Sequence, residues 1–175
     1  MDLQSPHARI LSEVKSRLDA MKEFRLIDEY HSQPIETVPK LAYPAVLVDI
    51  EECTYDELGE GSQSADSEIS VRIYQANYSQ SSQKAPEKSK KQALSVYELE
   101  AKVVAQLHGW APTVTIDKED HQFTSPFIRM SSRKGDEDQK GLRCRELVFS
   151  TSWEESFDEK RLLYPSISIN GEIIP

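Results

Sequence analysis

Hydrophobic residues near the N-terminus follow the period of a helix. They recur at spacings of three and four at Ile10, Leu11, Val14, Leu18 and Met21. This spacing predicts an amphipathic helix that lies on a core. Ser5 and Pro6 precede it, and both residue types favour the start of a helix. A short strand is expected next, over residues 24–30.

Two later segments alternate with the period of two that is typical of strands. Residues 43–50 place Val46 and Val48 on one side, and residues 68–78 do the same with Ile69 and Val71. Their β-branched content supports both strands. The segment between them is polar and contains Gly59, so we expect a long antiparallel pair joined by a mobile loop.

A second helix is predicted over residues 90–108, ending at Gly109. The predicted inward-facing stripe consists of Leu94, Tyr97, Ala101, Val104 and His108. Residues 110–123 are expected to be irregular. The segments 127–130 and 142–153 are predicted to form a final pair of strands, joined by a polar connection with glycines.

The predicted order is helix, three strands, helix, two strands. This order favours an α+β fold, with a mainly antiparallel sheet of about four or five strands and two helices packed on one face. We assign residues 1–157 to a single domain, because 175 residues suffice to bury a core. Residues 158–175 form a C-terminal extension, which either makes a hairpin through Asn170 and Gly171 or is an arm that adds a strand to a neighbour.

Charge is unevenly distributed along the chain. There are 30 acidic and 21 basic residues, a net charge of −9, which disfavours tight binding of duplex DNA. Acids accumulate between Asp49 and Glu68 without any Lys or Arg, and a lysine cluster follows from Lys84 to Lys91. Either these are two solvated loops, or they are oppositely charged faces that meet between neighbouring subunits.

The second interpretation gives a set of candidate interface residues in three groups. The groups are an acidic loop, a basic linker and an apolar C-terminal tail. Their members are Asp56, Glu57 and Glu60; Lys84, Lys88, Lys90 and Lys91; and Leu162, Leu163, Tyr164, Ile167 and Ile169.

The sequence offers no arrangement typical of catalysis. The four histidines lie on separate elements, and Cys53 and Cys144 have no metal-site or disulfide spacing. No glycine-rich phosphate loop or nucleophile motif is present. We therefore predict no catalytic residue, no metal and no cofactor. The lack of a signal segment or membrane span leads us to expect a cytoplasmic protein.

One enzyme hypothesis competes with this expectation. Restriction-type nucleases pair an acid at a strand end with an acid-x-Lys triplet around Mg²⁺. Asp49 is the acid at a strand end, and Glu100 with Lys102 forms the triplet. The triplet falls in a stretch with helical periodicity, whereas the nuclease fold places it on a strand. The nuclease is therefore the weaker hypothesis.

The layout of residues 8–153 resembles that of the tail-terminator, or tail-completion, proteins of long-tailed bacteriophages and prophages. The features that match are the N-terminal helix, the strand at 43–48, the polar hairpin, the strand at 69–74, the helix ending at 105–109 and the closing strand pair. The extension after Phe157 and the Ser/Lys-rich linker are departures from that layout.

The resemblance implies a structural protein without cofactor or catalytic residues. Such proteins form a hexameric ring on the tail tube, end its polymerisation and provide the surface on which the head connector docks. The implied partners are further copies of the chain, the tube protein and the connector, while DNA passes without specific binding. The protein would be found in the bacterial cytoplasm during assembly and then in the virion.

Two further possibilities follow from the sequence. The acidic loop could face the lumen of such a ring, where its charge would repel DNA and let it slide. The main alternative to a tail terminator is another protein-interaction module, either a head-closure protein or a cytoplasmic adaptor.

Overall fold

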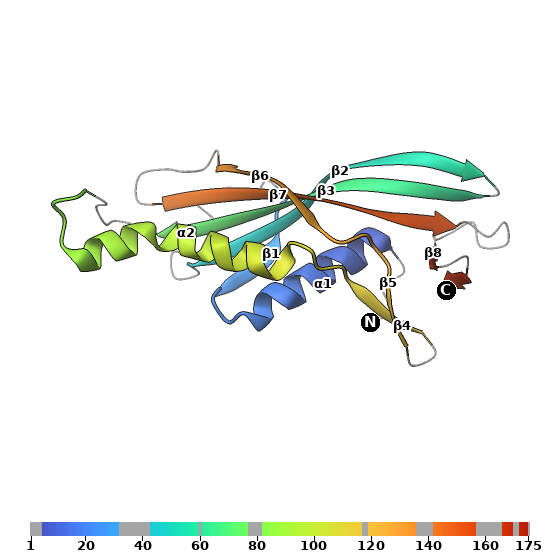
Figure 1. The fold of residues 1–175 in the computed structure, drawn as a ribbon, viewed down its shortest axis with the longest axis horizontal. Helices are drawn as coiled ribbons and strands as arrows, with labels where there is room; N and C mark the ends of the chain where they lie inside the picture. Colours follow the sequence, from blue (N-terminus) through green and yellow to red (C-terminus); the bar gives the residue numbers. More distant parts are fainter. Residues whose placement is uncertain are drawn as a thin grey trace.

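The structure, a computed structural model, describes residues 5–31, 43–59, 61–76, 82–116, 119–135, 142–156, 166–169 and 172–174. Two helices, α1 (Pro6–Ala20) and α2 (Glu87–Leu107), cover one face of a mainly antiparallel sheet. The molecule is elongated along the strands (Figure 1). The predicted α+β class is confirmed.

Three strands of fifteen residues each form the centre of the sheet. They are β2 (Ala45–Gly59), β3 (Ser62–Ala76) and β7 (Leu142–Ser156), paired antiparallel in that order. The short strand β1 (Leu26–Glu29) adds parallel to β2, and β6 (Ile128–Lys134) adds antiparallel to β7. These are the five strands that the sequence predicted.

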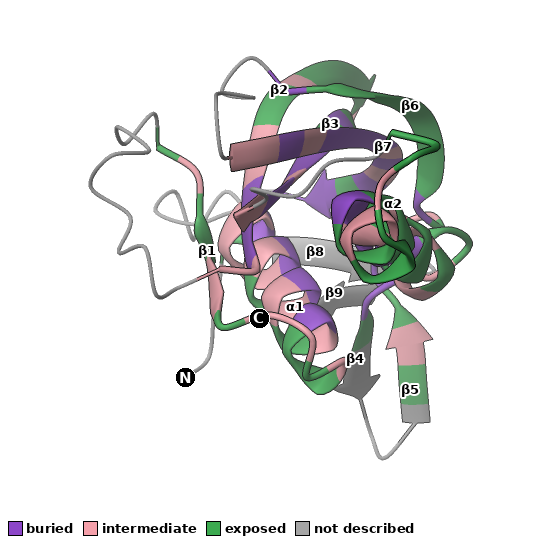
Figure 2. Ribbon diagram, turned by 90° about the vertical axis from the view of Figure 1, so that its left-hand side faces the viewer, coloured by how far each residue is buried: buried purple, intermediate pink, exposed green. Residues whose placement is uncertain are grey.

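The main core lies between this sheet and the two helices. Along β3, Ile69, Val71 and Ile73 point toward the helices and are fully buried, as their alternation predicted. Helix α1 contributes Val14 and Leu18 to the same cluster. The stripe predicted for the first helix is therefore confirmed, and Figure 2 shows buried positions on the side of each helix that faces the sheet.

The polar segment predicted as a mobile loop is strand instead. Strands β2 and β3 continue to Gly59 and Ser62, and Gly59 and Gly61 turn the chain with φ of +87° and +76°. The sequence prediction failed because it considered only the pair β2–β3. Strand β7 pairs with β3 from Ser62 to Ala76, so polar residues there gain a second ladder of backbone hydrogen bonds.

The inward face predicted for α2 is wrong. The residues that face the core are Ala93, Val96, Leu99, Val103 and Leu107. Leu94 and Tyr97 are instead 48% and 46% exposed, and Ala101 is also exposed. Both sets have helical spacing, so spacing alone could not choose between them.

The structure contains two further short hairpins, one that the sequence did not predict and one that it gave as one of two alternatives. Residues 110–123, expected to be irregular, contain β4 (Thr113–Ile116) paired with β5 (Glu119–Gln122). In the C-terminal extension, β8 (Ser166–Ile169) pairs with β9 (Glu172–Ile174), and Ile167 of β8 lies opposite Glu155 of the same chain. Neither helix of the described residues is long and apolar enough to cross a membrane.

Candidate interaction surfaces

The sheet is charge-polarised along its strands. Its Lys and Arg residues on β2, β3 and β7 are Arg72, Arg143 and Arg145, and all three lie in the half of the sheet near the start of α2. In that half they are balanced by the carboxylates of Asp49, Glu51 and Glu146, whereas the other half of these strands, the acidic half, carries carboxylates and no Lys or Arg. Its carboxylates are those of Glu52, Asp56, Glu57, Asp66, Glu68, Glu154 and Glu155.

The acidic half ends in what we call the hairpin tip, the segment Tyr55–Leu58 at the end of β2. Asp56 and Glu57 are exposed there. The two apolar side chains beside them are also in solvent: Tyr55 is 44% exposed and Leu58 is 54% exposed. Exposed apolar side chains beside carboxylates at the end of a long hairpin are suited to contact with another protein.

The opposite end of the molecule carries a basic surface on the first turns of α2. Figure 1 shows this end of α2 far from the end of the β2–β3 hairpin. Lys84, Lys88 and Lys91 are exposed, while Lys90 forms an ion pair with Glu87 at 2.7 Å. Leu94 and Tyr97, also exposed, follow Lys91 at successive three-residue steps, so the row from Lys88 to Tyr97 winds about half-way round the helix. We call Lys88, Lys91, Leu94 and Tyr97 the helix ridge.

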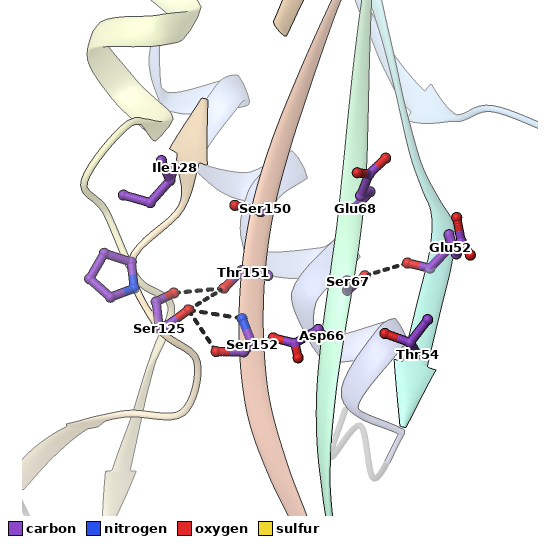
Figure 3. Close-up of a pocket in the computed structure, with 11 residues that line it drawn as sticks. Glu52, Thr54, Asp66, Ser67, Glu68, Ser125, Ile128, Ser150, Thr151 and Ser152 are labelled. Carbon is purple, nitrogen blue, oxygen red and sulfur yellow. Dashed lines mark hydrogen bonds between the residues drawn. The ribbon is translucent and has the colours of Figure 1, made fainter. Parts of the chain in front are cut away.

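A groove of about 380 Å³ crosses the acidic half of the sheet on the face away from the helices. Three carboxylates line it, those of Glu52, Asp66 and Glu68, together with hydroxyls that include Ser150 and Ser152 (Figure 3). Glu52 lies directly opposite Glu68 across the strand pair, an arrangement that is unfavourable for like charges. No Lys or Arg of the described residues lines this acidic groove.

A buried ion-pair cluster lies on the same face, in the half of the sheet that contains the arginines. The Glu146 carboxylate accepts hydrogen bonds from Arg72 Nε at 3.0 Å and Arg133 Nε at 2.5 Å. The Arg72 guanidinium also lies 3.8 Å from the centre of the Tyr30 ring and pairs with Glu51 at 2.7 Å. Burial alone would raise the pKa of Glu146, but Arg133 and Arg72 hold the pKa below its ordinary value.

A second cluster ties α2 to the sheet. Glu100 accepts hydrogen bonds from Arg145 Nε at 2.8 Å and from the Ser132 hydroxyl. Burial would raise the pKa of Glu100, but these two donors lower it overall. The guanidinium of Arg145 also lies 5.5 Å from the centre of the Tyr97 ring. Both charges of the Glu100–Arg145 pair are therefore used in holding the helix on the sheet.

The geometry required by the nuclease hypothesis is not formed. Glu100 and Lys102 lie on a helix, where Glu100 binds Arg145 and Lys102 binds Glu23. Asp49 alternates with the core residue Val48, so it points to the face of the sheet away from α2. Among the described residues, no three or more His, Cys, Asp or Glu side chains gather in a way that could hold a metal ion.

The structure separates the predicted interface residues into three places. Asp56 and Glu57 lie at the hairpin tip, and the four lysines lie at and just before the start of α2. Glu60, Leu162, Leu163 and Tyr164 lie outside the described residues, and Ile167 and Ile169 fall in β8.

Sequence reasoning missed the apolar part of both ends. Leu94 and Tyr97 were assigned to the core, and Tyr55 and Leu58 were not singled out. A signal was present for the helix, because Val96, Leu99 and Val103 form a second stripe of helical spacing on its opposite side. When one apolar stripe of a helix packs on the core, a second stripe stays exposed and can contact another protein.

Comparison with known proteins does not identify a family. No protein-family model matches the chain, and neither does any curated protein. Among solved structures, the chain is similar to one from the virion of a native gene transfer agent particle. That match covers 83% of this chain and 94% of the other, with 14% sequence identity and a TM-score of 0.44. At that TM-score the similarity establishes no shared function.

Proposed function

We propose that this protein is a structural subunit of a long-tailed phage or prophage particle, which caps the tail tube as a ring, most simply a hexamer. The ring would end tube polymerisation and offer a docking surface to the head connector. The observation that carries the proposal is the placement of unlike charges at opposite ends of one elongated molecule. The layout that resembles tail terminators supports it, since the α+β fold expected from that layout is the one found.

Closed rings need two different surfaces on each subunit. In a head-to-tail contact, one patch of a subunit binds a different patch of the next, and the assembly closes when the rotation allows it. An acidic end and a basic end on the same chain satisfy this requirement. Two identical ends would instead favour a symmetric dimer.

The acidic groove suits a face that DNA passes. Glu52, Asp66 and Glu68 repel phosphates, and a surface of one sign sets up a field that keeps DNA from adhering. The proposal therefore places this face toward the channel of the ring. Replacing the three by Gln, Asn and Gln in assembled particles should slow DNA release, and unchanged release would contradict a placement in the channel.

The direct experiment adds the purified protein to tail-tube protein of the same phage or prophage. If the protein caps tubes, their mean length falls as the molar ratio of this chain to tube protein rises. Electron microscopy should show an extra ring at one tube end. A length distribution that does not change at any ratio would contradict the capping role.

A further inference from the structure

We infer that the hairpin tip of one copy docks on the helix ridge of the next copy. This deepens the proposed function and rests on it for the ring, but it is a claim about one contact that can be tested without a tube. It assigns a use to four apolar side chains that lie about half exposed. These are Tyr55 and Leu58 at the tip and Leu94 and Tyr97 on the ridge.

Each end presents the same kind of composite surface. At the tip, two large apolar side chains about half exposed lie beside two exposed carboxylates, those of Asp56 and Glu57. On the ridge, Leu94 and Tyr97, also about half exposed, lie about one and two turns after Lys91. Apolar side chains bordered by charge have the composition of a protein interface, with an apolar centre and a polar rim.

The two surfaces are opposite in sign, so each fits the other and not itself. Two tips would bring four carboxylates together, and two ridges would bring lysines together; such like-charge contacts cost several kcal/mol. The contact of a tip with a ridge pairs Asp56 and Glu57 with Lys88 and Lys91. Charge therefore selects a second copy, turned head to tail, as the occupant of each surface.

The position of the two surfaces also suits this contact. The tip and the start of α2 lie at opposite ends of the long axis, so a copy can bind one neighbour through each end (Figure 1). Tyr97 is held in place by Arg145 and the pair that Arg145 forms with Glu100. A side chain already ordered in the free subunit loses less entropy on binding.

Charge reversal provides the test. One variant reverses the tip (Asp56→Lys with Glu57→Lys) and the other reverses the ridge (Lys88→Glu with Lys91→Glu). All four side chains are exposed and none forms an ion pair or side-chain hydrogen bond within the described residues, so both variants should fold as the wild type does. Circular dichroism and urea unfolding check this. Assembly is followed by sedimentation velocity against protein concentration at low salt.

Each variant alone should need at least about tenfold more protein to assemble than the wild type. An equimolar mixture should recover assembly, because every contact then joins opposite charges. A third variant with all four reversals in one chain should also assemble by itself. Assembly of either single-end variant at the wild-type concentration, or no recovery in the mixture, would overturn the inference.

Covalent trapping tests the same contact through the proximity of the two surfaces. In a background with Cys53→Ser, a chain with Leu58→Cys is mixed with a chain with Leu94→Cys under mild oxidation. Disulfide-linked dimers should exceed, by about tenfold, those of a control pair with Ser12→Cys on the exposed side of α1. Equal yields in both pairs would overturn the inference.

The outcomes separate this contact from the proposed function. Tube capping that survives in both charge-reversed variants would leave the capping role standing with another contact between subunits. Recovery in the mixture without any tube capping would keep the contact and remove the capping role.

Discussion

Arg72 is predicted to stabilise the fold far more than Arg133, although both bind the same carboxylate. The side chains of Arg72 and Glu146 are only 14% and 5% exposed, whereas that of Arg133 is 61% exposed. Replacing Arg72 by Met keeps an apolar side chain of similar length but removes the guanidinium, and with it the charge and the contact over the Tyr30 ring. Glu146 then remains buried with only a solvent-exposed partner.

The expected magnitude follows from burial. Removing one member of a buried ion pair costs about 3–5 kcal/mol, because the other charge stays desolvated. Arg133 still reaches Glu146, so we expect the low end, about 3 kcal/mol, for Arg72→Met. An exposed ion pair contributes about 0–1 kcal/mol, so Arg133→Met should lower the free energy of unfolding by less than about 1 kcal/mol.

Urea unfolding followed by circular dichroism measures both values under the same conditions. The midpoint should fall in Arg72→Met with an unchanged slope, because the amount of surface exposed on unfolding is the same. The reasoning would be refuted if Arg72→Met cost less than about 1 kcal/mol, or if Arg133→Met cost as much as Arg72→Met.

Three further predictions concern stability. Leu94→Ser should change the free energy of unfolding by less than about 0.5 kcal/mol, because Leu94 is exposed. Val96→Ala, on the buried face of α2, should lower it by about 1–3 kcal/mol. If urea unfolding gave the larger loss for Leu94→Ser, the face with Leu94 would be the one that packs on the core. Gly135→Ala should destabilise by about 1–3 kcal/mol, because a Cβ there would lie 2.2 Å from Cys144 Sγ, and wild-type thermal stability of that variant would contradict the close packing. The pKa of Glu146 is lower in the folded than in the unfolded protein, where it is about 4.3, so its contribution to stability is fully present above that pH and is lost as pH falls through the folded pKa. Glu146→Gln should therefore flatten the decline in unfolding free energy below about pH 4. An equal decline in acid in both proteins would refute this.

Much of the fold could be predicted because it depends on local periodicity. The alternation of Val46 and Val48 on β2 and of Ile69 and Val71 on β3 gave the correct inward face of both strands. The alternation is visible in the sequence because one face of each strand packs against the helices and the other does not.

The errors arose where a distant element decides the structure. The polar ends of β2 and β3 are strands because β7 pairs with β3 as far as Ser62, a partner that sequence alternation does not reveal. The inward face of α2 was misassigned because Leu94 and Val96 belong to two apolar stripes with the same period. The choice between the stripes depends on which one meets the sheet.

The sequence predicted the charge of the candidate surfaces but not their position or their apolar residues. Asp56 and Lys91 were assigned to opposite charge groups from composition alone. Only the structure places these groups at opposite ends of one body and sets Leu58 and Leu94 beside them in solvent. A surface that joins residues from a strand end and a helix start has no period in the sequence.

The most direct measurement of the central claim is the mass of the purified protein, by native mass spectrometry and light scattering, across protein concentration and salt. Head-to-tail assembly through unlike charges predicts a closed oligomer, most simply a hexamer, that dissociates as salt rises and screens the contact. A monomer at every concentration and in low salt, or a symmetric dimer insensitive to salt, would contradict the account.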